Sequence, residues 1–322
     1  MPPRTRKFLL LVIAGAALFY VAFSFWSNLP ALRDALSQAD WRLIPLVFAL
    51  SLLGYALRFA NWQFYLSQIG FTKVPRGESA LIYVSGFSMS ISPGKVGELV
   101  RQYLLQERFG IPMARTGSLL VVDRLTDLVA LVLIIAVGAL RYRYGGGILA
   151  VVGVLVIGSL LVLASRPLVV RVIAGLALLK PLAGRMEVIR SLYESCAILL
   201  GTWRVFPILL LSLAAWSCEA LGFWVVLHAL HVTQASIFTA CFAYAFSTLM
   251  GALTFLPGGI GLTEGSMTGL LVLVGIAKAP AAAATLLIRV ATLWFGVILG
   301  IGCLTLVERL LKIHPDKLVI PA

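Results

Sequence analysis

The sequence has 322 residues, of which 61% are hydrophobic and only 12% are charged, and its mean hydropathy is +1.01. A soluble domain carries roughly 25% charged residues, so this composition excludes a water-soluble globular protein and predicts an all-α integral membrane protein. The net charge of +13 comes from Lys and Arg residues that cluster between apolar runs, which is typical of charges at the cytoplasmic face of a membrane and not of nucleic-acid binding.

Six apolar runs are long enough to cross a hydrocarbon core of roughly 30 Å as helices. These predicted spans are residues 8–26, 42–66, 117–140, 146–165, 205–231 and 282–307. The first follows a short basic segment and has some features of a signal peptide. Its apolar part is long for one, and no small-residue cleavage site follows it, so we expect a retained span.

Two further regions, 79–110 and 237–277, are apolar but are each broken near the middle by a Pro-Gly turn. Proline ends a helix, and freed backbone groups are costly in hydrocarbon unless protein or a wet cavity surrounds them. We therefore expect two re-entrant helical hairpins. The stretch 168–204 mixes apolar residues with five basic ones, a pattern that favours a helical elbow in the membrane interface.

The positive charges predict the orientation of the chain in the cell inner membrane. The basic residues within 4–7 place the N-terminus in the cytoplasm. If both broken regions are hairpins that return to the face they entered from, the stretch 168–204 and the basic residues within 309–317 are cytoplasmic too. Arg141 and Arg143 fit less well, because this topology leaves them outside.

An internal duplication is the strongest signal in the sequence. Residues 92–98 (SPGKVGE) and 256–264 (LPGGIGLTE) share the pattern P-G-x-[VI]-G with a glutamate one or three residues later, and flanking matches keep an offset of about 162 to 165 residues. We predict one transmembrane domain over 1–322, with repeat 1 at about 42–140, a connector at 141–204 and repeat 2 at about 205–307. The charges indicate that the repeats start on opposite faces, which is the inverted architecture of many transporters. A parallel duplication without transport is the alternative.

The two hairpin tips are candidate binding sites. Each tip starts a new helix, whose N–H groups and dipole favour an anion such as a lipid phosphate. The alternative is that both tips are interfacial loops. The candidate tip residues are Pro93, Gly94, Gly97, Pro257, Gly258, Gly259 and Gly261.

Ionisable residues inside or beside the predicted spans are candidates for the same site, because each costs on the order of 3 kcal/mol to insert and so pairs or lines a polar path. Arg124 and Arg289 each lie seven residues into a span, which places them about 10 Å deep, with Glu98 and Glu264 as plausible partners. The candidates are Arg58, Glu98, Arg101, Asp123, Arg124, Asp127, Glu219, Glu264 and Arg289.

These charges have two interpretations. They either line a cavity whose arginines hold a phosphate headgroup, or form internal ion pairs that only hold the helices together. Arg58 could instead extend to the interface. The four cysteines and three histidines lack ligand spacing, so we expect no disulfide, metal or cofactor. No G-x-x-x-x-G-K-[ST] sequence predicts an ATP site.

The same residues carry a resemblance to a known family. Arg58 with Trp62, the stretch 92–101 (SPGKVGELVR), Asp123-Arg124, Glu219, the stretch 256–264 and Arg289 resemble the transmembrane region of lysylphosphatidylglycerol synthases. The resemblance covers about residues 8 to 310. The family includes stand-alone flippase-like proteins and a group associated with hopanoid lipid synthesis, so the resemblance implies translocation of a lipid between leaflets.

Full-length synthases carry a soluble aminoacyl-transferase domain after the membrane region, and this sequence has none, so we do not expect lysyl transfer by this chain alone. The expected function is therefore movement of an anionic phospholipid or an isoprenoid-type lipid across the inner membrane, with the membrane lipid and possible lipid-biosynthesis enzymes as partners. Two alternatives stay open: a membrane-embedded enzyme that modifies a lipid, with Asp123 and Asp127 as acid–base groups or metal ligands, and a non-catalytic member of a lipid-synthesis complex.

Overall fold

The computed structural model describes residues 3–92, 98–139, 153–154, 158, 194–199, 203–254 and 256–310. Its elements up to residue 139 are helices with the following bounds: α1 Pro3–Trp26, α2 Leu29–Ser37, α3 Ile44–Gln68 preceded by a 3-10 turn Trp41–Leu43, α4 Arg76–Ser85 continued by a 3-10 turn Gly86–Met89, α5 Val100–Phe109, and α6 Met113–Ala139. Those from residue 205 on are α11 Val205–Ala229, α12 Ile237–Leu253, α13 Leu262–Leu273, α14 Lys278–Arg289, a π-helical turn Val290–Trp294, and α15 Phe295–Leu310.

Local sequence explains where these helices begin and end. The side chain of Ser236 accepts a hydrogen bond from the amide of Thr239 at 3.2 Å and so caps α12. Gly110, with φ of 67°, ends α5, and Gly275, with φ of 90°, makes the turn between α13 and α14. Over residues 237–277 the described chain forms α12, the 3-10 turn Pro257–Gly259 and α13, which packs against α12.

Three described helical segments are long and apolar enough to cross a membrane: Trp41–Gln68, Val205–Ala229 and Lys278–Leu310. They coincide with the predicted spans 42–66, 205–231 and 282–307. Ala14–Trp26 and Leu29–Ser37 add a fourth only if this pair, bent by 94°, is one span.

The other predicted spans have different outcomes. Predicted span 117–140 overlaps α6 up to Ala139, but α6 is not among the helices that qualify as spans, because it carries Asp123, Arg124 and Asp127 close together. Predicted span 146–165 and the elbow at 168–204 lie outside the described residues, except for the short pieces given above.

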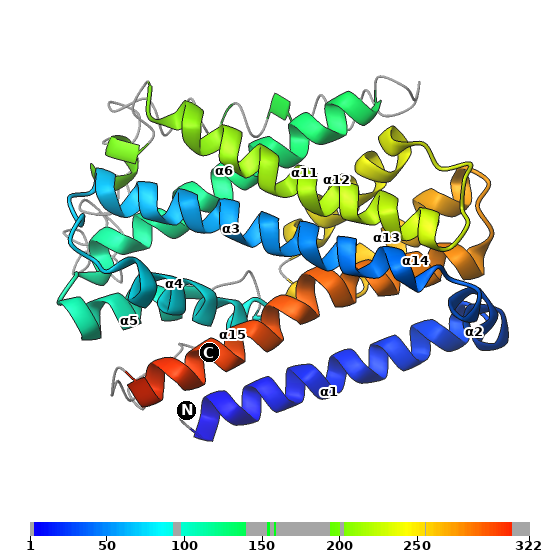
Figure 1. Cartoon of the computed structure of the whole chain (residues 1–322), viewed down its shortest axis with the longest axis horizontal. Coiled ribbons are helices and arrows are strands. Elements are labelled where there is room, and N and C mark those ends of the chain that lie inside the picture. The colour runs from blue at the N-terminus through cyan, green and yellow to red at the C-terminus, as the bar shows by residue number, and fades with distance from the viewer. Residues whose placement is uncertain are drawn as a thin grey trace, which may run out of the picture.

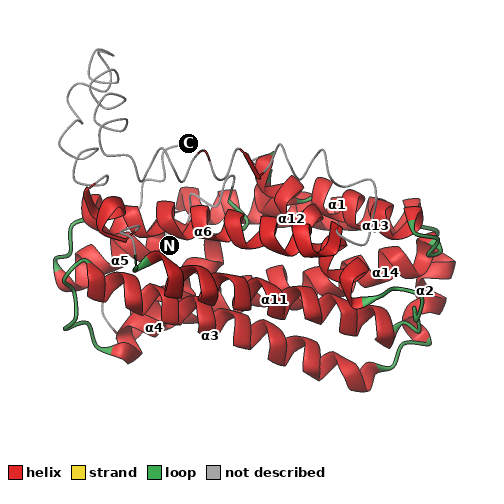
Figure 2. Ribbon diagram, turned by 90° about the horizontal axis from the view of Figure 1, so that it is seen from above, coloured by secondary structure: helices red, strands yellow, loops and turns green. Residues whose placement is uncertain are grey.

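The first helices of the two repeats, α3 and α11, lie side by side along the molecule (Figures 1 and 2) and contact each other extensively. In Figure 1, α3 runs from right to left and α11 from left to right. Each has 25 residues, and their first residues are 161 positions apart. The close approach depends on Gly54, where an added Cβ would lie 3.3 Å from the carbonyl oxygen of Ala215.

Each predicted hairpin packs against the last helix of the other predicted repeat. Helices α4 and α5 lie in the left half of Figure 1, and α12 and α13 lie in the right half. The first hairpin contacts α15, and the second contacts α6. Glycines allow both contacts: a Cβ on Gly300 of α15 would collide with the backbone of Phe87 and Ser88, and one on Gly138 of α6 would collide with Phe242.

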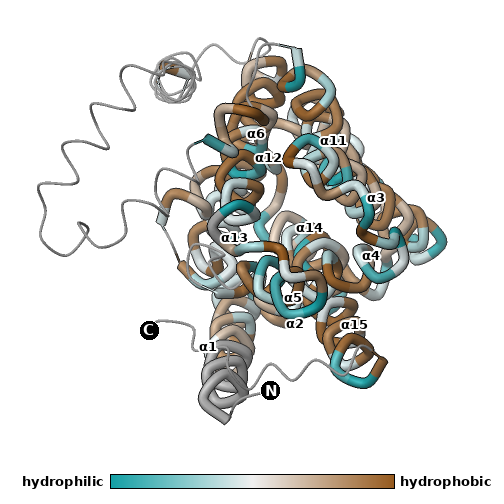
Figure 3. The backbone as a smooth tube through the Cα atoms, turned by 90° about the vertical axis from the view of Figure 1, so that its left-hand side faces the viewer, coloured by the Kyte–Doolittle hydropathy of each residue, from teal (hydrophilic) through white to brown (hydrophobic). Residues whose placement is uncertain are grey.

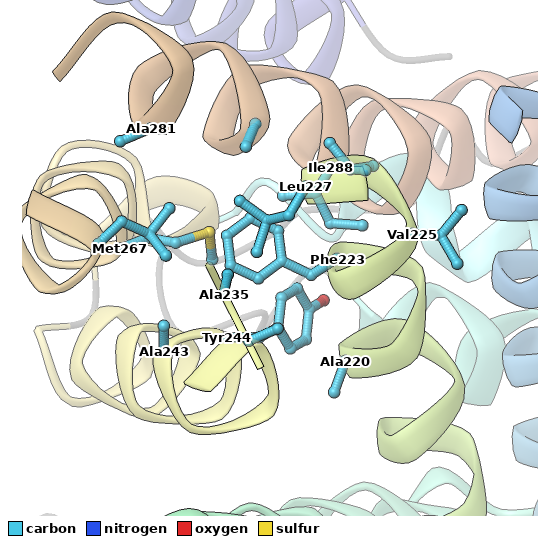
Figure 4. Close-up of a cluster of buried hydrophobic side chains, with 14 of the residues drawn as sticks. Ala220, Phe223, Val225, Leu227, Ala235, Ala243, Tyr244, Met267, Ala281 and Ile288 are labelled. Carbon is cyan, nitrogen blue, oxygen red and sulfur yellow. The ribbon is translucent and has the colours of Figure 1, made fainter. Parts of the chain in front are cut away.

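Two clusters of buried apolar side chains fill the bundle, one toward each end. Figure 4 shows part of the cluster formed by α11 to α14, where Phe223, Leu227 and Met267 pack together. The other includes Trp62 and Leu104 and is built mainly from α3 to α6 and α15. Figure 3 shows that hydrophobic residues predominate in most of the helices and that hydrophilic residues are frequent in linkers and at helix ends.

A layer of charged residues separates the two clusters. Along α3, Val47 belongs to one cluster and Trp62 to the other, with Arg58 between them. In the structure α6 begins at Met113 and α14 at Lys278. Arg124 and Arg289 are therefore each eleven residues into their helices, which corresponds to roughly 16 Å along the helix axis.

Candidate functional site

A cavity of about 360 Å³ lies in this charged layer, where both hairpins meet α3, α6, α11 and the π-helical turn. Its volume is within the range of roughly 300–1,000 Å³ that is usual for small-molecule sites. Eight charged residues line it, four arginines and four carboxylates, and all eight are sequence-predicted candidates: Arg58, Glu98, Arg101, Asp123, Arg124, Asp127, Glu219 and Arg289. The formal charges of this lining cancel.

Arg58 joins three helices at the centre of the cavity. Its guanidinium contacts Asp127 on α6 at 2.9 Å and Glu219 on α11 at 3.2 Å, and it lies 4.2 Å from the centre of the Trp216 ring. The hydroxyl of Tyr244 on α12 donates to Glu219 at 2.6 Å. The alternative in which Arg58 extends to the interface is therefore wrong, because its charge is fully engaged inside the bundle.

Glu98 organises the part of the cavity that belongs to the first repeat. It contacts Arg124 at 3.0 Å and Arg101 at 3.5 Å, and accepts a hydrogen bond from Ser90 at 3.1 Å. Arg124 also contacts Asp123 at 3.2 Å and Asp127 at 3.6 Å. One guanidinium thus serves three carboxylates, and its side chain is still 31% exposed, so a ligand in the cavity can reach it.

Arg289 and Glu264 form the corresponding pair in the second repeat, 2.7 Å apart. Arg289 also donates to the carbonyl of Gly258 at 2.5 Å, and Tyr20 of α1 donates to Glu264 at 3.0 Å. Glu264 is fully buried, and the side chain of Arg289 is only 10% exposed. Both arginines have the glutamate partner that we expected. The Arg289–Glu264 pair is more buried than the Arg124–Glu98 pair.

The second hairpin tip needs its glycines, because Gly258, Gly259 and Gly261 have φ of 59°, 66° and 98°. Gly258 and Gly259 line the cavity, and Pro257 starts the 3-10 turn between the two helices. The amide of Gly261 donates to Glu264 at 2.7 Å. At the start of α13, the protein's own carboxylate therefore takes a place that we expected a lipid phosphate to fill.

The corresponding residues of the first tip, Pro93, Gly94 and Gly97, lie outside the described residues.

Aromatic residues complete the site, and the sequence pattern did not single them out. Arg101 lies 4.3 Å from the centre of the Tyr83 ring and 5.1 Å from that of Phe87. Trp216 donates to Asp127 at 2.8 Å. The repeat offset could have found one pair, because Tyr83 and Tyr244 both line the cavity and are each the eighth residue of their helix.

A surface ion pair connects the outer ends of the first hairpin. The guanidinium of Arg108 donates to Glu78 at 2.7 Å and lowers the pKa of that carboxyl from its ordinary value. Arg108 is 40% exposed, so solvent screens the pair.

Among the residues that the structure describes, no three or more His, Cys, Asp or Glu side chains are grouped so that they could hold a metal ion.

The sequence of this chain is similar to those of known membrane proteins. The family model described as the lysylphosphatidylglycerol synthase TM region matches residues 9–300. A UPF0104 membrane protein of Methanothermobacter thermautotrophicus is 25% identical, over 89% of this chain and 90% of its own. UPF0104 membrane proteins of Methanocaldococcus jannaschii and Pyrococcus horikoshii are 22% and 23% identical, with at least 95% of each chain covered.

Proposed function

Because this chain belongs to the family of the lysylphosphatidylglycerol synthase TM region, we propose that it moves a lipid with a phosphate-bearing headgroup, an anionic phospholipid or an isoprenoid-type lipid, between the leaflets of the cell inner membrane. The observation that carries the proposal is the cavity of about 360 Å³ in the middle of the helices, lined by four arginines. Charged groups at that depth are expensive, so they usually mark a substrate path.

The proposed membrane arrangement is a single transmembrane domain with six spans, two re-entrant hairpins and cytoplasmic termini. Repeats 42–140 and 205–307 would be inverted relative to each other. The opposite directions of α3 and α11 support this arrangement, as do the positions of the two hairpins in opposite halves of the molecule (Figure 1). In such folds the substrate binds between the repeats near the bilayer midplane.

The headgroup would bind to Arg124 and Arg101. A guanidinium can donate two parallel hydrogen bonds to a phosphate, and Arg124 is accessible from the cavity. The Tyr83 and Phe87 rings, over which its guanidinium lies, hold Arg101 in place. The cavity is too small for a whole lipid, so the tails would stay in the bilayer beside its apolar rim, where Leu253 and Leu256 are exposed.

During transport, the ion pairs Arg124–Glu98 and Arg289–Glu264 would exchange their accessibility to the headgroup. In the structure, Arg124 is 31% exposed and Arg289 only 10%. A rocking of the repeats that buries Arg124 against Glu98 and frees Arg289 from Glu264 would present the headgroup to the other leaflet. Substrate binding would bias this equilibrium only through its different affinity for the two states.

Reconstitution into liposomes that contain a fluorescent phosphatidylglycerol, with a reagent that quenches only the outer leaflet, tests the proposal. Wild-type protein should exchange the label between leaflets. Arg124→Ala and Arg289→Ala should lower exchange to the level of protein-free liposomes. The exposed Arg108→Ala is a matched control and should keep the wild-type rate. Wild-type rates in both cavity variants would contradict the site.

The same liposomes separate the alternatives. A chemically changed lipid would indicate a membrane-embedded enzyme. Neither exchange nor a new product would favour a non-catalytic partner of a lipid-synthesis complex.

Arg289→Ala also leaves the buried carboxylate of Glu264 without its cation, which can unfold the protein by itself. The double variant Glu264→Gln/Arg289→Gln removes both charges. It should fold and still fail to exchange lipid.

A further inference from the structure

The four carboxylates that line the cavity differ in their ion-pair and hydrogen-bond partners. Asp127 contacts Arg58 and Trp216 at 2.9 and 2.8 Å, and Glu219 contacts Arg58 and Tyr244 at 3.2 and 2.6 Å. Glu98 contacts two arginines and Ser90. Asp123 is held by Arg124 at 3.2 Å, through the same guanidinium nitrogen that serves Glu98. A ligand that engages this nitrogen therefore disturbs Asp123 most.

A second, much smaller void also borders Asp123. Its volume is about 10 Å³, and Asp123 lines both this void and the main cavity. That space is about the minimum for one water molecule. The void is also lined by Tyr65, Arg101 and Gln102, whose exposed fractions are 1%, 3% and 1%.

Within the part of the chain that the structure describes, each of these three side chains carries a buried polar atom without a hydrogen-bond partner: the Tyr65 hydroxyl, Arg101 Nε and Gln102 Oε1. Buried polar groups are rarely left unpaired, because this costs about 1–3 kcal/mol each. A site with a free acceptor and a free hydroxyl beside a carboxylate suits a water molecule or the O–H of a protonated carboxyl group.

We propose that Asp123 takes up one proton when a phosphate-bearing headgroup binds to Arg124. This inference rests on the proposed function. The headgroup draws the guanidinium of Arg124 away from Asp123, and an anion in a cavity whose lining is formally neutral leaves one negative charge in excess. An uncompensated charge in a low-dielectric site is neutralised by protonation.

The proton balance is simple. The carboxylate of Asp123 and a hydronium ion give the carboxylic acid and water. The new O–H then donates to Gln102 Oε1, directly or through water in the small void. Release of the headgroup on the other side returns Arg124 to Asp123 and the proton to water, so that lipid and proton move together.

The groups that face Asp123 come from every neighbouring helix of the first half. They are Arg58 and Tyr65 on α3, Tyr83 on α4, Glu98 and Arg101 at α5, and Arg124 and Asp127 on α6. Arg58 is paired with Asp127, and Arg101 is paired with Glu98. Arg124 is therefore the cation whose movement changes the electrostatic environment of Asp123.

Calorimetric binding of a short-chain phosphatidylglycerol to the detergent-solubilised full chain tests the proposal. The titration is repeated in two buffers of different ionisation enthalpy, which gives the number of protons taken up per lipid. Wild-type protein should take up about one. Its affinity should weaken by up to tenfold per pH unit as the pH rises, because proton uptake is linked to binding. Asp123→Asn should bind with no proton uptake and little pH dependence.

Two further variants sharpen the result. Gln102→Leu removes the free acceptor and should reduce proton uptake without removing binding. Asp34→Asn, at an exposed position on α2, is the matched control and should behave as wild type.

Proton uptake that is unchanged in Asp123→Asn would overturn the inference, and so would wild-type binding without proton uptake. The second result would leave the proposed function intact. Absence of any binding would remove the headgroup site and this inference with it.

Discussion

Arg58 and Glu219 occupy the same place in their helices, the fifteenth of 25 residues, and carry opposite charges. A duplicated segment that kept the same residue there would place two like charges against each other where α3 and α11 meet. Divergence to Arg and Glu gives an ion pair of 3.2 Å instead. Contact between α3 and α11 therefore requires opposite charges at these two positions.

The first prediction concerns this central ion pair. Arg58→Ala should lower the free energy of unfolding by about 3–5 kcal/mol, because it leaves Asp127 and Glu219 buried without their cation. The triple variant Arg58→Met/Asp127→Asn/Glu219→Gln removes the uncompensated charges and should recover most of this loss. Unfolding in mixed detergent micelles measures both. A single variant as stable as Arg108→Ala would show that the pair does not stabilise the bundle.

Close contacts through glycine determine how the helices pack at the scale of elements. Gly300 lets the 3-10 turn after α4 lie directly on α15, and Gly138 lets α12 lie on α6. The π-helical turn Val290–Trp294 follows Arg289 and lines the cavity with Thr292 and Leu293. Such turns are frequent at functional sites. Here the hydroxyl of Tyr55 donates to the carbonyl of Thr292, which ties α3 to this turn.

The second prediction compares two glycines of α15 that are two residues apart. Gly300→Val should destabilise the protein by about 1–3 kcal/mol, because the added atoms meet the backbone of Phe87 and Ser88 and push the first hairpin away. Gly302→Val is the control, since an added Cβ there has open space. The thermal unfolding midpoint measures both. Equal midpoints would mean that the hairpin does not depend on this contact.

At the scale of the whole molecule, the hairpins are exchanged between the repeats, because each packs on the last helix of the other half. Residues of both halves therefore line the cavity. Helix α1 lies outside the repeats and is tied to the second half, since Tyr20 donates to Glu264 and Trp294 donates to Tyr20 at 3.3 Å.

The third prediction concerns the proposed inversion of the repeats. Thr72 follows α3 and Thr233 follows α11, 161 residues apart, and both are exposed. In a variant with all four cysteines replaced, Thr72→Cys should react with a membrane-impermeant maleimide only from the cytoplasmic side. Thr233→Cys should react only from outside. Modification of both from the same side of sealed vesicles would contradict the inversion.

The sequence by itself determined the membrane class, the break between α12 and α13 at a Pro-Gly turn, and the charged residues that line the cavity. These follow from local properties: hydrophobic length, helix-breaking Pro-Gly pairs, and charges that lipid does not tolerate unpaired. All eight charged lining residues were identifiable in this way.

Only the tertiary structure decided which charges meet and that Arg58 is internal. It also decided that Glu264 caps its own helix. The aromatic residues Tyr83, Trp216 and Tyr244 complete the cavity. Aromatic residues are common in apolar helices and give no signal of their own. Partners such as Arg58 and Glu219 are 161 residues apart, and the packing of α3 on α11 brings them together. Hydrophobic periodicity defines a helix, but the choice of its neighbour depends on glycine contacts and ion pairs that exist only once the halves are assembled.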